Sequence, residues 1–210
     1  MGLYGFVTEQ LPSAPARVLE VGCGRGDLAR AVAESGYEVV AIDPHAPAGE
    51  LFRATSLEEF AGPEPFDAVV ASLALHHVAD LPGALDKIVS LLRPTGSLIV
   101  NEHAVDRLDE PTARWYLEKR AVIRPDAPRS LEQCLHDWEE HHAGLHGYAA
   151  MRKELDRRFT ERFFAWMPYL YGELADAATE AEERQLIDAG AIQATGFRYV
   201  GERQLTSHAA

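Results

Sequence analysis

The sequence predicts an α/β fold with a doubly wound, mostly parallel β-sheet, and three observations lead to this prediction. Short runs rich in Val, Ile and Leu alternate along the chain with runs whose apolar residues recur at helical spacing. A turn with three glycines follows the first of the strand-like runs. The chain has 210 residues, 47% hydrophobic and 25% charged, which is enough to bury one sizeable core. We therefore expect one domain that covers residues 1–210.

The first expected elements are a strand, a tight turn and a helix. Residues 16–21 favour a strand, glycines follow, and residues 27–34 are good helix formers. Gly36 ends this helix, and residues 37–42 form the next strand, which ends before Pro44. This order is typical of parallel strands connected by helices.

Four further strands and two helices continue the alternation. Each strand-like run is short and apolar, and each helix-like run has apolar residues on one face. Gly190 ends the second of these helices. The expected strands are 51–54, 66–72, 96–101 and 191–200, the last alone or in a hairpin with 202–206, and the expected helices are 82–92 and 179–189.

The alternation stops between residues 104 and 175. This segment is rich in charged and aromatic residues and is interrupted by Pro125, Pro128 and Pro168. We expect two or three helices here, packed over the edge of the sheet as a helical insertion after the fifth strand. Such an insertion is a natural place for a lid over a substrate.

The net charge of −13 is unfavourable for binding to a nucleic acid, because such binding depends on Lys and Arg that displace counterions from phosphates. Residues 152–162 contain five basic residues, but acidic residues are interleaved with them, so we interpret this stripe as a solvated helix face. We therefore expect no nucleic-acid partner. A small molecule is the expected partner, and the chain is expected to be a monomer or a homodimer.

Cysteine content and hydropathy indicate a cytoplasmic protein. The chain has two cysteines, and a bridge between Cys23 and Cys134 would distort the glycine turn that contains Cys23. The N-terminus does not have the pattern of a secretory signal or of a myristoylation site. No apolar run approaches the roughly 20 residues needed to cross a bilayer, so we expect no membrane partner.

The glycine turn, residues 22–26, predicts a nucleotide-like ligand. Glycines let the backbone turn sharply and let a ligand approach it, while the next helix points its first amides at the same place. The spacing is Gly-x-Gly-x-Gly, whereas nicotinamide and flavin enzymes use Gly-x-Gly-x-x-Gly. Glu20 suits a ligand with a cationic end, and Asp43 can accept hydrogen bonds from ribose hydroxyls. The alternative is a turn that only packs the helix on the strand.

Three segments in this order resemble the class I S-adenosylmethionine (SAM)-dependent methyltransferases, which have a Rossmann-like fold. They are 18–26 (VLEVGCGRG), 66–77 (FDAVVASLALHH) and 92–100 (LRPTGSLIV). Among these enzymes the chain is most similar to those that methylate small molecules. The resemblance covers residues 16–102 well and residues 179–200 loosely.

The resemblance implies a site for SAM, with S-adenosylhomocysteine as the product. It implies that Glu20 and the glycines surround the methionine part, that Asp43 holds the ribose and that Pro44 lies against the adenine. Thr55 or Ser56 stands where many members have an Asp that binds the adenine amino group, so this contact falls to the backbone or to Glu58. The implied cofactor-binding residues are Glu20, Gly22, Cys23, Gly24, Gly26, Asp43, Pro44, Thr55, Ser56, Leu57, Ser72, Leu73 and Ala74.

The connection between Asp43 and Thr55 is short for a helix that usually joins these strands, and the chain before residue 16 is also short. We expect the cofactor to be less covered on these sides. The segment 104–175 is then expected to close the site.

Methyl transfer from a sulfonium is a direct displacement, so an enzyme mainly aligns the acceptor and excludes water. A base helps when the acceptor loses a proton. The catalytic candidates are His77, His103 and Glu102, which follow strands at the edge where ligands bind in such sheets. The alternative for each is a role in capping or packing.

Further residues are candidates for binding the substrate. His142 and His146 are four residues apart, so we expect them on one helix face with Glu139. Glycines at 144 and 147 weaken this helix and no third ligand has a fixed spacing, so we predict no metal site. For the aromatic residues, the alternative is a role in the hydrophobic core. The substrate candidates are His76, Trp115, Tyr116, His142 and His146.

The predicted function is transfer of a methyl group from SAM to an oxygen or nitrogen of a small molecule, in secondary metabolism. One alternative is other SAM chemistry on the same fold, such as cyclisation or elimination. Another is a non-catalytic protein that binds SAM. The glycine spacing disfavours a dehydrogenase.

Overall fold

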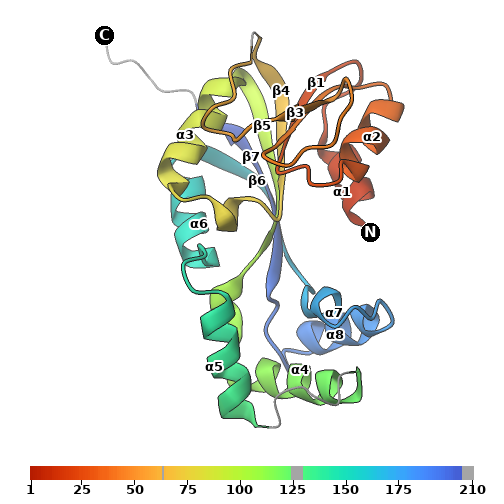
Figure 1. Cartoon of the computed structure of the whole chain (residues 1–210), viewed down its shortest axis with the longest axis vertical. Helices are drawn as coiled ribbons and strands as arrows, with labels where there is room; N and C mark the ends of the chain where they lie inside the picture. The colour runs from red at the N-terminus through yellow and green to blue at the C-terminus, as the bar shows by residue number, and fades with distance from the viewer. Residues whose placement is uncertain (63, 124–129, 205–210) are drawn as a thin grey trace. The chain divides into compact units, whose positions relative to one another are not determined.

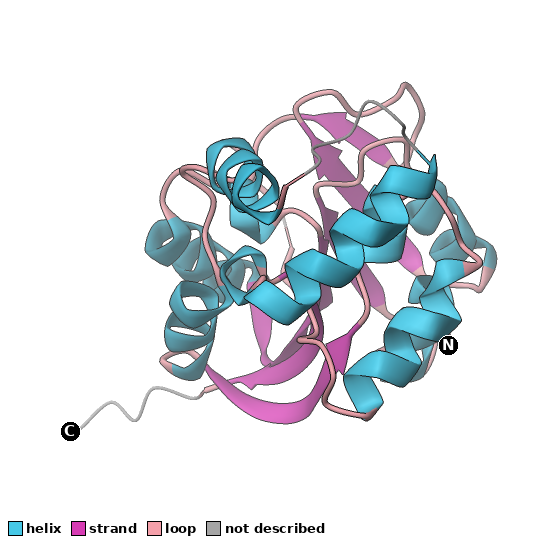
Figure 2. Ribbon diagram, turned by 90° about the horizontal axis from the view of Figure 1, so that it is seen from below, coloured by secondary structure: helices cyan, strands magenta, loops and turns pink. Residues whose placement is uncertain are grey.

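A computed structural model of the chain describes all residues except 63, 124–129 and 205–210. Its centre is a seven-stranded sheet with the strand order β3-β2-β1-β4-β5-β7-β6. The pairs β1–β2, β2–β3, β1–β4 and β4–β5 are parallel. Helices flank the sheet, whose strands are magenta in Figure 2. The predicted α/β class is therefore confirmed. The strands are β1 Arg17–Val21, β2 Glu38–Asp43, β3 Phe52–Ala54, β4 Phe66–Ser72, β5 Leu92–His103, β6 Phe159–Met167 and β7 Gly196–Arg203.

The helices account for most of the remaining described residues. The N-terminal helices α1 and α2 lie on one side of the sheet in Figure 1, and α3 lies on the other. The helices are α1 Leu3–Gln10, α2 Asp27–Glu34, α3 Leu81–Leu91, α4 Glu110–Ile123, α5 Leu131–His141, α6 Tyr148–Asp156, α7 Leu170–Glu173 and α8 Thr179–Asp188, with 3-10 turns η1 Leu75–His77 and η2 Val105–Arg107.

The chain forms two compact units. Unit 1 comprises Met1–Glu102, Ala150–Phe164 and the chain from Arg198 onward. Unit 2 comprises His103–Ala149 and Ala165–Phe197.

The core of unit 1 lies against the central strands. The strands β1 and β4 are almost entirely buried, as expected for parallel strands covered on both faces. Phe6 and Val7 of α1 and Val32 of α2 pack in one cluster with Val18 and Val70 of these strands. The apolar residues at helical spacing in the sequence therefore face the sheet.

The core of unit 2 is aromatic. Trp115 and Tyr116 of α4 form a buried cluster with Trp138 of α5 and with Leu170 and Leu174. Glu183 of α8 is fully buried and accepts hydrogen bonds of 2.9–3.0 Å from the backbone N–H groups of residues 169–171. Unit 2 thus has a hydrophobic core of its own.

Three expectations for the segment 104–175 are wrong. Its described residues contain four helices, α4 to α7, instead of two or three. The segment contains the strand β6, whose charged residues Glu161 and Arg162 interrupt the apolar pattern that would have indicated a strand. The helix α5 ends at His141, because Gly144 has a positive φ of 85° in the turn that follows. His142 and His146 therefore do not share a helix face with Glu139.

The final strand also differs from the expected one. It runs from Gly196 to Arg203, so its start is five residues later than predicted. Residues 191–192 form a bend, and residues 193–195 have no regular secondary structure. Of the alternative hairpin segment 202–206, residues 205 and 206 lie outside the described residues.

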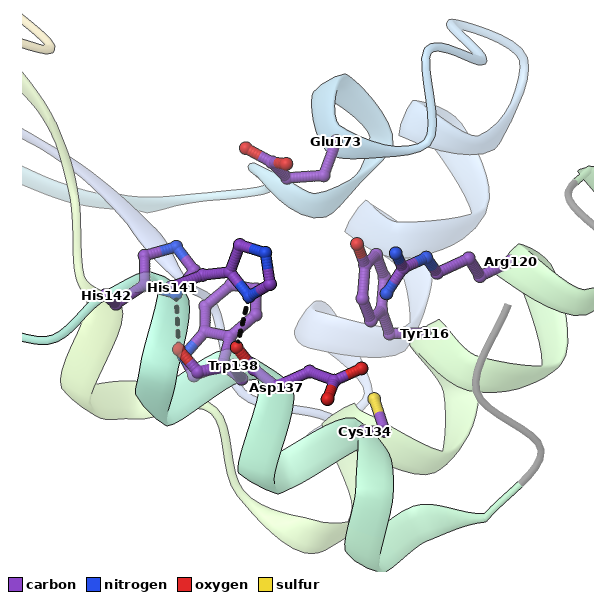
Figure 3. A pocket seen from close by; sticks show the side chains of 8 residues that line it. All are labelled: Tyr116, Arg120, Cys134, Asp137, Trp138, His141, His142 and Glu173. Carbon is purple, nitrogen blue, oxygen red and sulfur yellow. Dashed lines mark hydrogen bonds between the residues drawn. The ribbon is translucent and has the colours of Figure 1, made fainter. Parts of the chain in front are cut away.

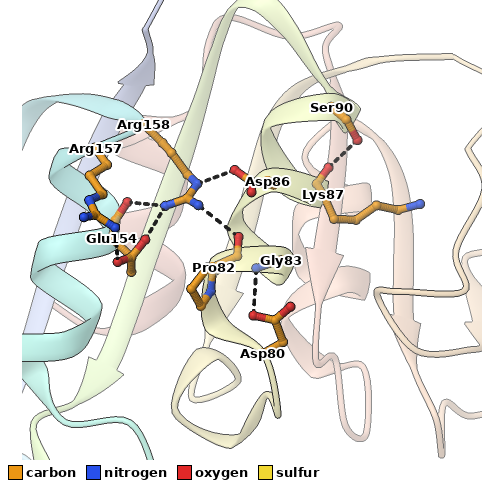
Figure 4. A network of polar contacts seen from close by, with 9 residues as sticks. All are labelled: Asp80, Pro82, Gly83, Asp86, Lys87, Ser90, Glu154, Arg157 and Arg158. Carbon is orange, nitrogen blue, oxygen red and sulfur yellow. Dashed lines mark hydrogen bonds and ion pairs between the residues drawn. The ribbon is translucent and has the colours of Figure 1, made fainter.

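The basic stripe of residues 152–162 is not the solvated helix face that we expected. Arg158 follows the end of α6, its side chain is only 14% exposed, and Arg162 belongs to the strand β6. Arg158 makes an ion pair of 2.6 Å with Asp86 of α3 and another of 2.6 Å with Glu154 of α6. It also donates a hydrogen bond of 3.2 Å to the Pro82 carbonyl oxygen. Figure 4 shows that the guanidinium lies between the two helices, with Arg157 beside Glu154. The stripe therefore joins α6 to α3 within unit 1.

The helices in the described part of the chain have at most 14 residues. None of them is long and apolar enough to cross a membrane.

Candidate cofactor and active site

A cavity of about 470 Å³ lies in unit 1 at the carboxyl ends of the central strands. Ligands of open α/β sheets bind at this edge. Nine of the residues predicted from the sequence line it, and they come from four separate segments of the chain. They are Gly22, Asp43, Pro44, Thr55, Ser56, Leu57, Leu73, Ala74 and His77.

The glycine turn that borders this cavity requires glycine for steric reasons. Gly22, Gly24 and Gly26 have φ values of 74°, 50° and 78°, in the left-handed region. A Cβ atom on Gly22 would lie 2.6 Å from the Cβ atom of Ala74. At Gly24, in contrast, no atom lies within 4 Å of the position of a Cβ. The backbone at Gly24 is therefore open to a ligand.

Asp43 is held in place by the backbone at the end of β2. Its Oδ2 accepts a hydrogen bond of 3.0 Å from the Gly24 N–H, and its Oδ1 accepts one of 2.7 Å from the His45 N–H. Each carboxylate oxygen has a further lone pair. Asp43 can therefore accept hydrogen bonds from two neighbouring hydroxyl groups of a ligand.

Glu20 of β1 is a buried carboxyl group with an unused oxygen. Its side chain is 6% exposed, and its Oε2 has no hydrogen-bond partner among the described residues. Burial raises the pKa of the carboxyl to about 7, and the negative charges of Asp27 and Asp43 act in the same direction. A hydrogen bond from the Ala29 backbone opposes this shift. A cationic ligand group would stabilise the carboxylate.

Glu20, the open glycine turn and Asp43 together fit the groups that SAM carries. Glu20 matches its ammonium group, and Asp43 matches its ribose hydroxyls. The open glycine turn leaves room for the part of SAM between these two groups to lie against the backbone. Glu20 itself does not line the cavity, and neither do Cys23, Gly24, Gly26 or Ser72, which lie in the strand ends and the turn beside it.

The thiol of Cys23 lies in the same turn. It is buried, and it is free rather than part of a disulfide. Burial raises its pKa to about 11, and the negative charges of Glu20 and Asp43 act in the same direction. The thiol therefore stays protonated at neutral pH.

The loop after β4 is clamped by Glu102 of β5. Its Oε1 accepts hydrogen bonds of 2.7 Å from the Ala74 N–H and 2.6 Å from the Leu75 N–H. Its Oε2 lies 2.5 Å from Nδ1 of His76. Glu102 and His76 are 1% and 4% exposed. These contacts favour a positioning role for both residues, instead of the predicted catalytic role of Glu102 and substrate role of His76.

His77 is the histidine that lines the cavity. Desolvation lowers the pKa of its imidazole, and the neighbouring His76 acts in the same direction, while Glu102 opposes the shift. The neutral form of His77 is therefore favoured. A neutral imidazole can accept a proton from an acceptor molecule.

His103, the next residue after Glu102 in β5, belongs to unit 2 and is 1% exposed. Its ring stacks on Tyr169 with 3.8 Å between ring centroids. It also makes edge contacts with Trp138 and His142, at 5.4 and 5.3 Å. Two predicted residues, His103 and His142, thus lie in one aromatic cluster.

The other substrate candidates lie elsewhere in unit 2. Trp115 is buried and donates a hydrogen bond of 3.2 Å from its Nε1 to Glu182. Tyr116 lines a second cavity together with His142. His146 lies in the connection between α5 and α6. Within unit 2 the structure therefore places Tyr116 and His142 at one cavity, and Trp115 and His146 do not belong to its lining.

Some residues that line the unit 1 cavity were not predicted. Val21 and Ile42 lie at the carboxyl ends of β1 and β2, so the rule that ligands bind at this edge could have found them. Val78 and Ala79 also line the cavity, and they carry no sequence signal. Glu58, the alternative partner for an adenine amino group, belongs to the lining as well.

Comparison with known proteins places this chain in a family. Residues 5–138 match the family model described as "Methyltransferase domain". The ubiquinone biosynthesis O-methyltransferase of Rhodopseudomonas palustris (strain BisB5) is 35% identical over 97 residues, which are 40% of this chain and 38% of the relative. The same-named protein of Xylella fastidiosa (strain 9a5c) is 34% identical over 114 residues, 46% and 45% of the two chains. The matches thus span less than half the length of these curated relatives.

Solved structures share the fold. The N-methyltransferase NodS from Bradyrhizobium japonicum WM9, in complex with S-adenosyl-L-homocysteine, has a TM-score of 0.53 at 15% identity and covers 92% of this chain and 80% of its own. An S-adenosylmethionine-dependent methyltransferase from Mesorhizobium loti has a TM-score of 0.61 at 16% identity, with 95% and 96% covered. Since the family model matches more than half of the residues, the chain belongs to the methyltransferase domain family, whose cofactor is SAM.

Proposed function

We propose that this protein transfers a methyl group from SAM to an oxygen atom of a small molecule. The observation that carries the proposal is the buried, unused carboxylate oxygen of Glu20 beside a glycine turn that is open at Gly24. The names of the relatives from R. palustris and X. fastidiosa, both O-methyltransferases, favour oxygen over nitrogen. NodS, an N-methyltransferase, shares only the fold.

When bound, SAM supplies a methyl group on a positively charged sulfur. In this proposal Glu20 binds the ammonium group of the cofactor, and Asp43 accepts hydrogen bonds from its ribose hydroxyls. Pro44 and residues 55–58 form the wall against its adenine. The fixed backbone of the turn and of the clamped loop after β4 holds these groups in place before the ligand arrives.

His77 removes the proton of the acceptor hydroxyl in this proposal. It lines the cavity, and its lowered pKa keeps the imidazole neutral and ready to accept a proton. Its neighbours Glu102 and His76 hold η1, the turn that contains it, in place. His103 stays a predicted alternative base, and the segment 104–175 stays a predicted lid.

Binding of SAM tests the first half of the proposal. We expect isothermal titration to show micromolar binding to the wild type, and Glu20→Gln to weaken it by about tenfold or more because a charge-assisted hydrogen bond is lost. Glu34→Gln, an exposed carboxyl at the end of α2, is the matched control and should bind as the wild type does. No binding at millimolar SAM contradicts the proposal.

Transfer to an acceptor tests the second half. Labelled SAM is incubated with a panel of phenols, catechols, carboxylates and amines, and the methylated products are identified by mass spectrometry. Products methylated on oxygen support the proposal, and products methylated only on nitrogen contradict it. Rapid release of methylthioadenosine without any acceptor would instead favour cyclisation or elimination. Binding without turnover across the panel would favour a non-catalytic role.

Two further expectations concern the setting of the enzyme. Both cysteines of the chain are free thiols, which supports a cytoplasmic location. Secondary metabolism is the predicted setting, and the relatives' names offer ubiquinone biosynthesis as the alternative. A small-molecule acceptor without a nucleic-acid or membrane partner is part of the same proposal.

A further inference from the structure

Unit 2 contains a cavity of about 280 Å³ between α4, α5 and α7 (Figure 3). This volume is slightly below the range of about 300–1,000 Å³ that is usual for small-molecule pockets, so it suits a small ligand. Its apolar surface includes the rings of Tyr116 and Trp138, whose centroids lie 6.1 Å apart, and the buried Cys134. Aromatic rings of this kind can hold the flat body of a small organic ligand.

Two histidines in this cavity present hydrogen-bond acceptors. Nδ1 of His141 lies 2.6 Å from the Asp137 carbonyl oxygen, and Nδ1 of His142 lies 2.8 Å from the Trp138 carbonyl oxygen. A carbonyl oxygen can only accept a hydrogen bond, so each Nδ1 must carry the proton. In a neutral imidazole with a protonated Nδ1, the other nitrogen is an acceptor. In the neutral form of each ring, Nε2 is therefore an acceptor.

Carboxyl groups add to this acceptor character. Glu173 of α7 makes no hydrogen bond or ion pair with the described residues and lines the cavity. Asp137 of α5 also lines it and uses Oδ1 to accept a hydrogen bond of 2.6 Å from Gln133. Arg120 is the cation of the lining, and its guanidinium lies over the Tyr116 ring at 5.8 Å. The lining therefore has two carboxylates, of Glu173 and Asp137, and one guanidinium, of Arg120.

The charges are separated within the cavity. Figure 3 shows the rings of His141 and His142 on one side and Arg120 with Tyr116 on the other, with Glu173 near the histidines. The histidine side thus offers a carboxylate and two imidazole acceptors to a group with several N–H donors. A protonated amine is such a group, and it is also attracted to the face of an aromatic ring.

We propose that this cavity is a binding site for a small aromatic amine. The ammonium group binds between Glu173 and the two imidazole rings, and the ring lies against Trp138 and Tyr116. Arg120, at the other end, donates a hydrogen bond to an oxygen substituent of the ligand. This site consists of residues of unit 2 alone and does not depend on the methyl transfer proposed above.

The test compares three probes that share a phenol ring and differ in charge at the other end. They are tyramine, a cation; 4-(2-hydroxyethyl)phenol, which is neutral; and 3-(4-hydroxyphenyl)propionate, an anion. We expect tyramine to bind with a dissociation constant of about 1 mM, a reasonable value for a ligand of this size. We expect the neutral probe to bind about tenfold more weakly and the anion not to bind.

Fluorine NMR locates the binding. The chain has three tryptophans, so protein made with 5-fluorotryptophan gives three signals, and Trp138→Phe identifies the signal of Trp138. Tyramine should shift this signal, and Glu173→Gln should weaken the effect by about tenfold. Glu118→Gln changes an exposed carboxyl of α4 outside the cavity and should leave it unchanged.

The Glu173 side chain is exposed, so Glu173→Gln is expected to keep the fold, and the unshifted signals of the other tryptophans verify this. Equal binding of tyramine and the neutral probe overturns the proposal. Stronger binding of the anion, or a Trp138 signal that tyramine does not move, also overturns it. Because no cofactor is present in this experiment, its failure is separate from a failure of methyl transfer.

Discussion

The carboxylate of Glu102 and the imidazole of His76 form a hydrogen bond of 2.5 Å in the interior of unit 1. The other oxygen of the same carboxylate accepts hydrogen bonds from two consecutive backbone N–H groups, those of Ala74 and Leu75. Just before them, Leu73 has a positive φ of 52°, a conformation that is unfavourable for this residue type. Glu102 therefore fixes a strained turn that lines the unit 1 cavity.

Removal of this carboxylate should loosen the cavity. We expect Glu102→Ala to lower the free energy of unfolding by about 2–5 kcal/mol, because the buried N–H of Leu75 and the partly buried N–H of Ala74 lose their acceptor. The KM for SAM should rise by about tenfold or more, since Ala74 and His77 line the cavity. Urea unfolding and steady-state kinetics measure the two effects.

Glu102→Gln separates positioning from a catalytic role. The amide oxygen of Gln can still accept both backbone hydrogen bonds, so we expect this variant to recover most of the SAM affinity and the turnover. A catalytic base, in contrast, could not be replaced by an amide. A kcat reduced as strongly in Glu102→Gln as in Glu102→Ala, with both proteins folded, would show that Glu102 is the base.

Gly22→Ala should abolish tight cofactor binding. The new methyl group would lie 2.6 Å from the Cβ atom of Ala74, and the residue would have to keep a φ of 74°. We expect the affinity for SAM, measured by titration calorimetry, to fall by about a hundredfold. Gly172→Ala is the control, because no atom lies within 4 Å of its new Cβ and its φ is not positive. An unchanged affinity in Gly22→Ala would rule out the proposed contact of the turn with the cofactor.

Glu20 should make the stability of the ligand-free protein depend on pH. Its pKa is about 7 in the folded protein, against 4.5 for an ordinary carboxyl, so the folded state binds this proton more tightly than the unfolded state. This stabilising contribution is complete below about pH 4.5 and is lost as the pH rises through 7. Its size is on the order of 3 kcal/mol. Urea unfolding at pH 5–8 should show this decline relative to Glu20→Gln.

The same proton should control the affinity for SAM. An ammonium group is bound by the ionised carboxylate, so we expect the affinity of the wild type to rise between about pH 5.5 and 8. Glu20→Gln should show a flatter profile. A wild-type profile parallel to that of Glu20→Gln in titration calorimetry would mean that Glu20 does not touch the charged part of the cofactor.

The protonation of His77 should determine how the activity falls at acidic pH. We expect His77→Asn to lower kcat by about 10²–10⁴-fold with little change in the KM for SAM, as for loss of a general base. Because the pKa of His77 is lowered, the wild-type kcat should fall only below the ordinary histidine value of about 6.5. If His77→Asn leaves kcat unchanged, another group is the base. His103→Asn is then the next variant to measure.

The fold around the unit 1 cavity was predictable because local sequence determines it. A strand, a glycine turn with φ values of 50–78° and a helix must follow one another within a few residues, and Gly22 and Asp43 line the cavity at the end of this pattern. The contact between Glu102 and His76 was not predictable, since it joins residues 26 positions apart through buried side chains. The positions of Glu102 and His76 near strand ends indicated a functional role, but they did not show which role each residue has.

The segment 104–175 was harder to predict for physical reasons. The alternation of β6 is interrupted by Glu161 and Arg162, which pair with Arg152 and Glu202. The end of α5 depends on the conformation of Gly144, which sequence spacing does not show. The aromatic cluster around His103 joins residues from β5, α5 and the loop before α7, so it exists only after the chain has folded.

The two free thiols have a practical consequence for experiments on this enzyme. Burial raises the pKa of both Cys23 and Cys134, so neither is a thiolate at neutral pH. Alkylating reagents and maleimides react with thiolates and should therefore spare the native protein. A single cysteine placed on the surface of either unit could then carry a fluorescent or spin label without removal of the natural ones. Pairs of such labels would report the distance between the two units in solution.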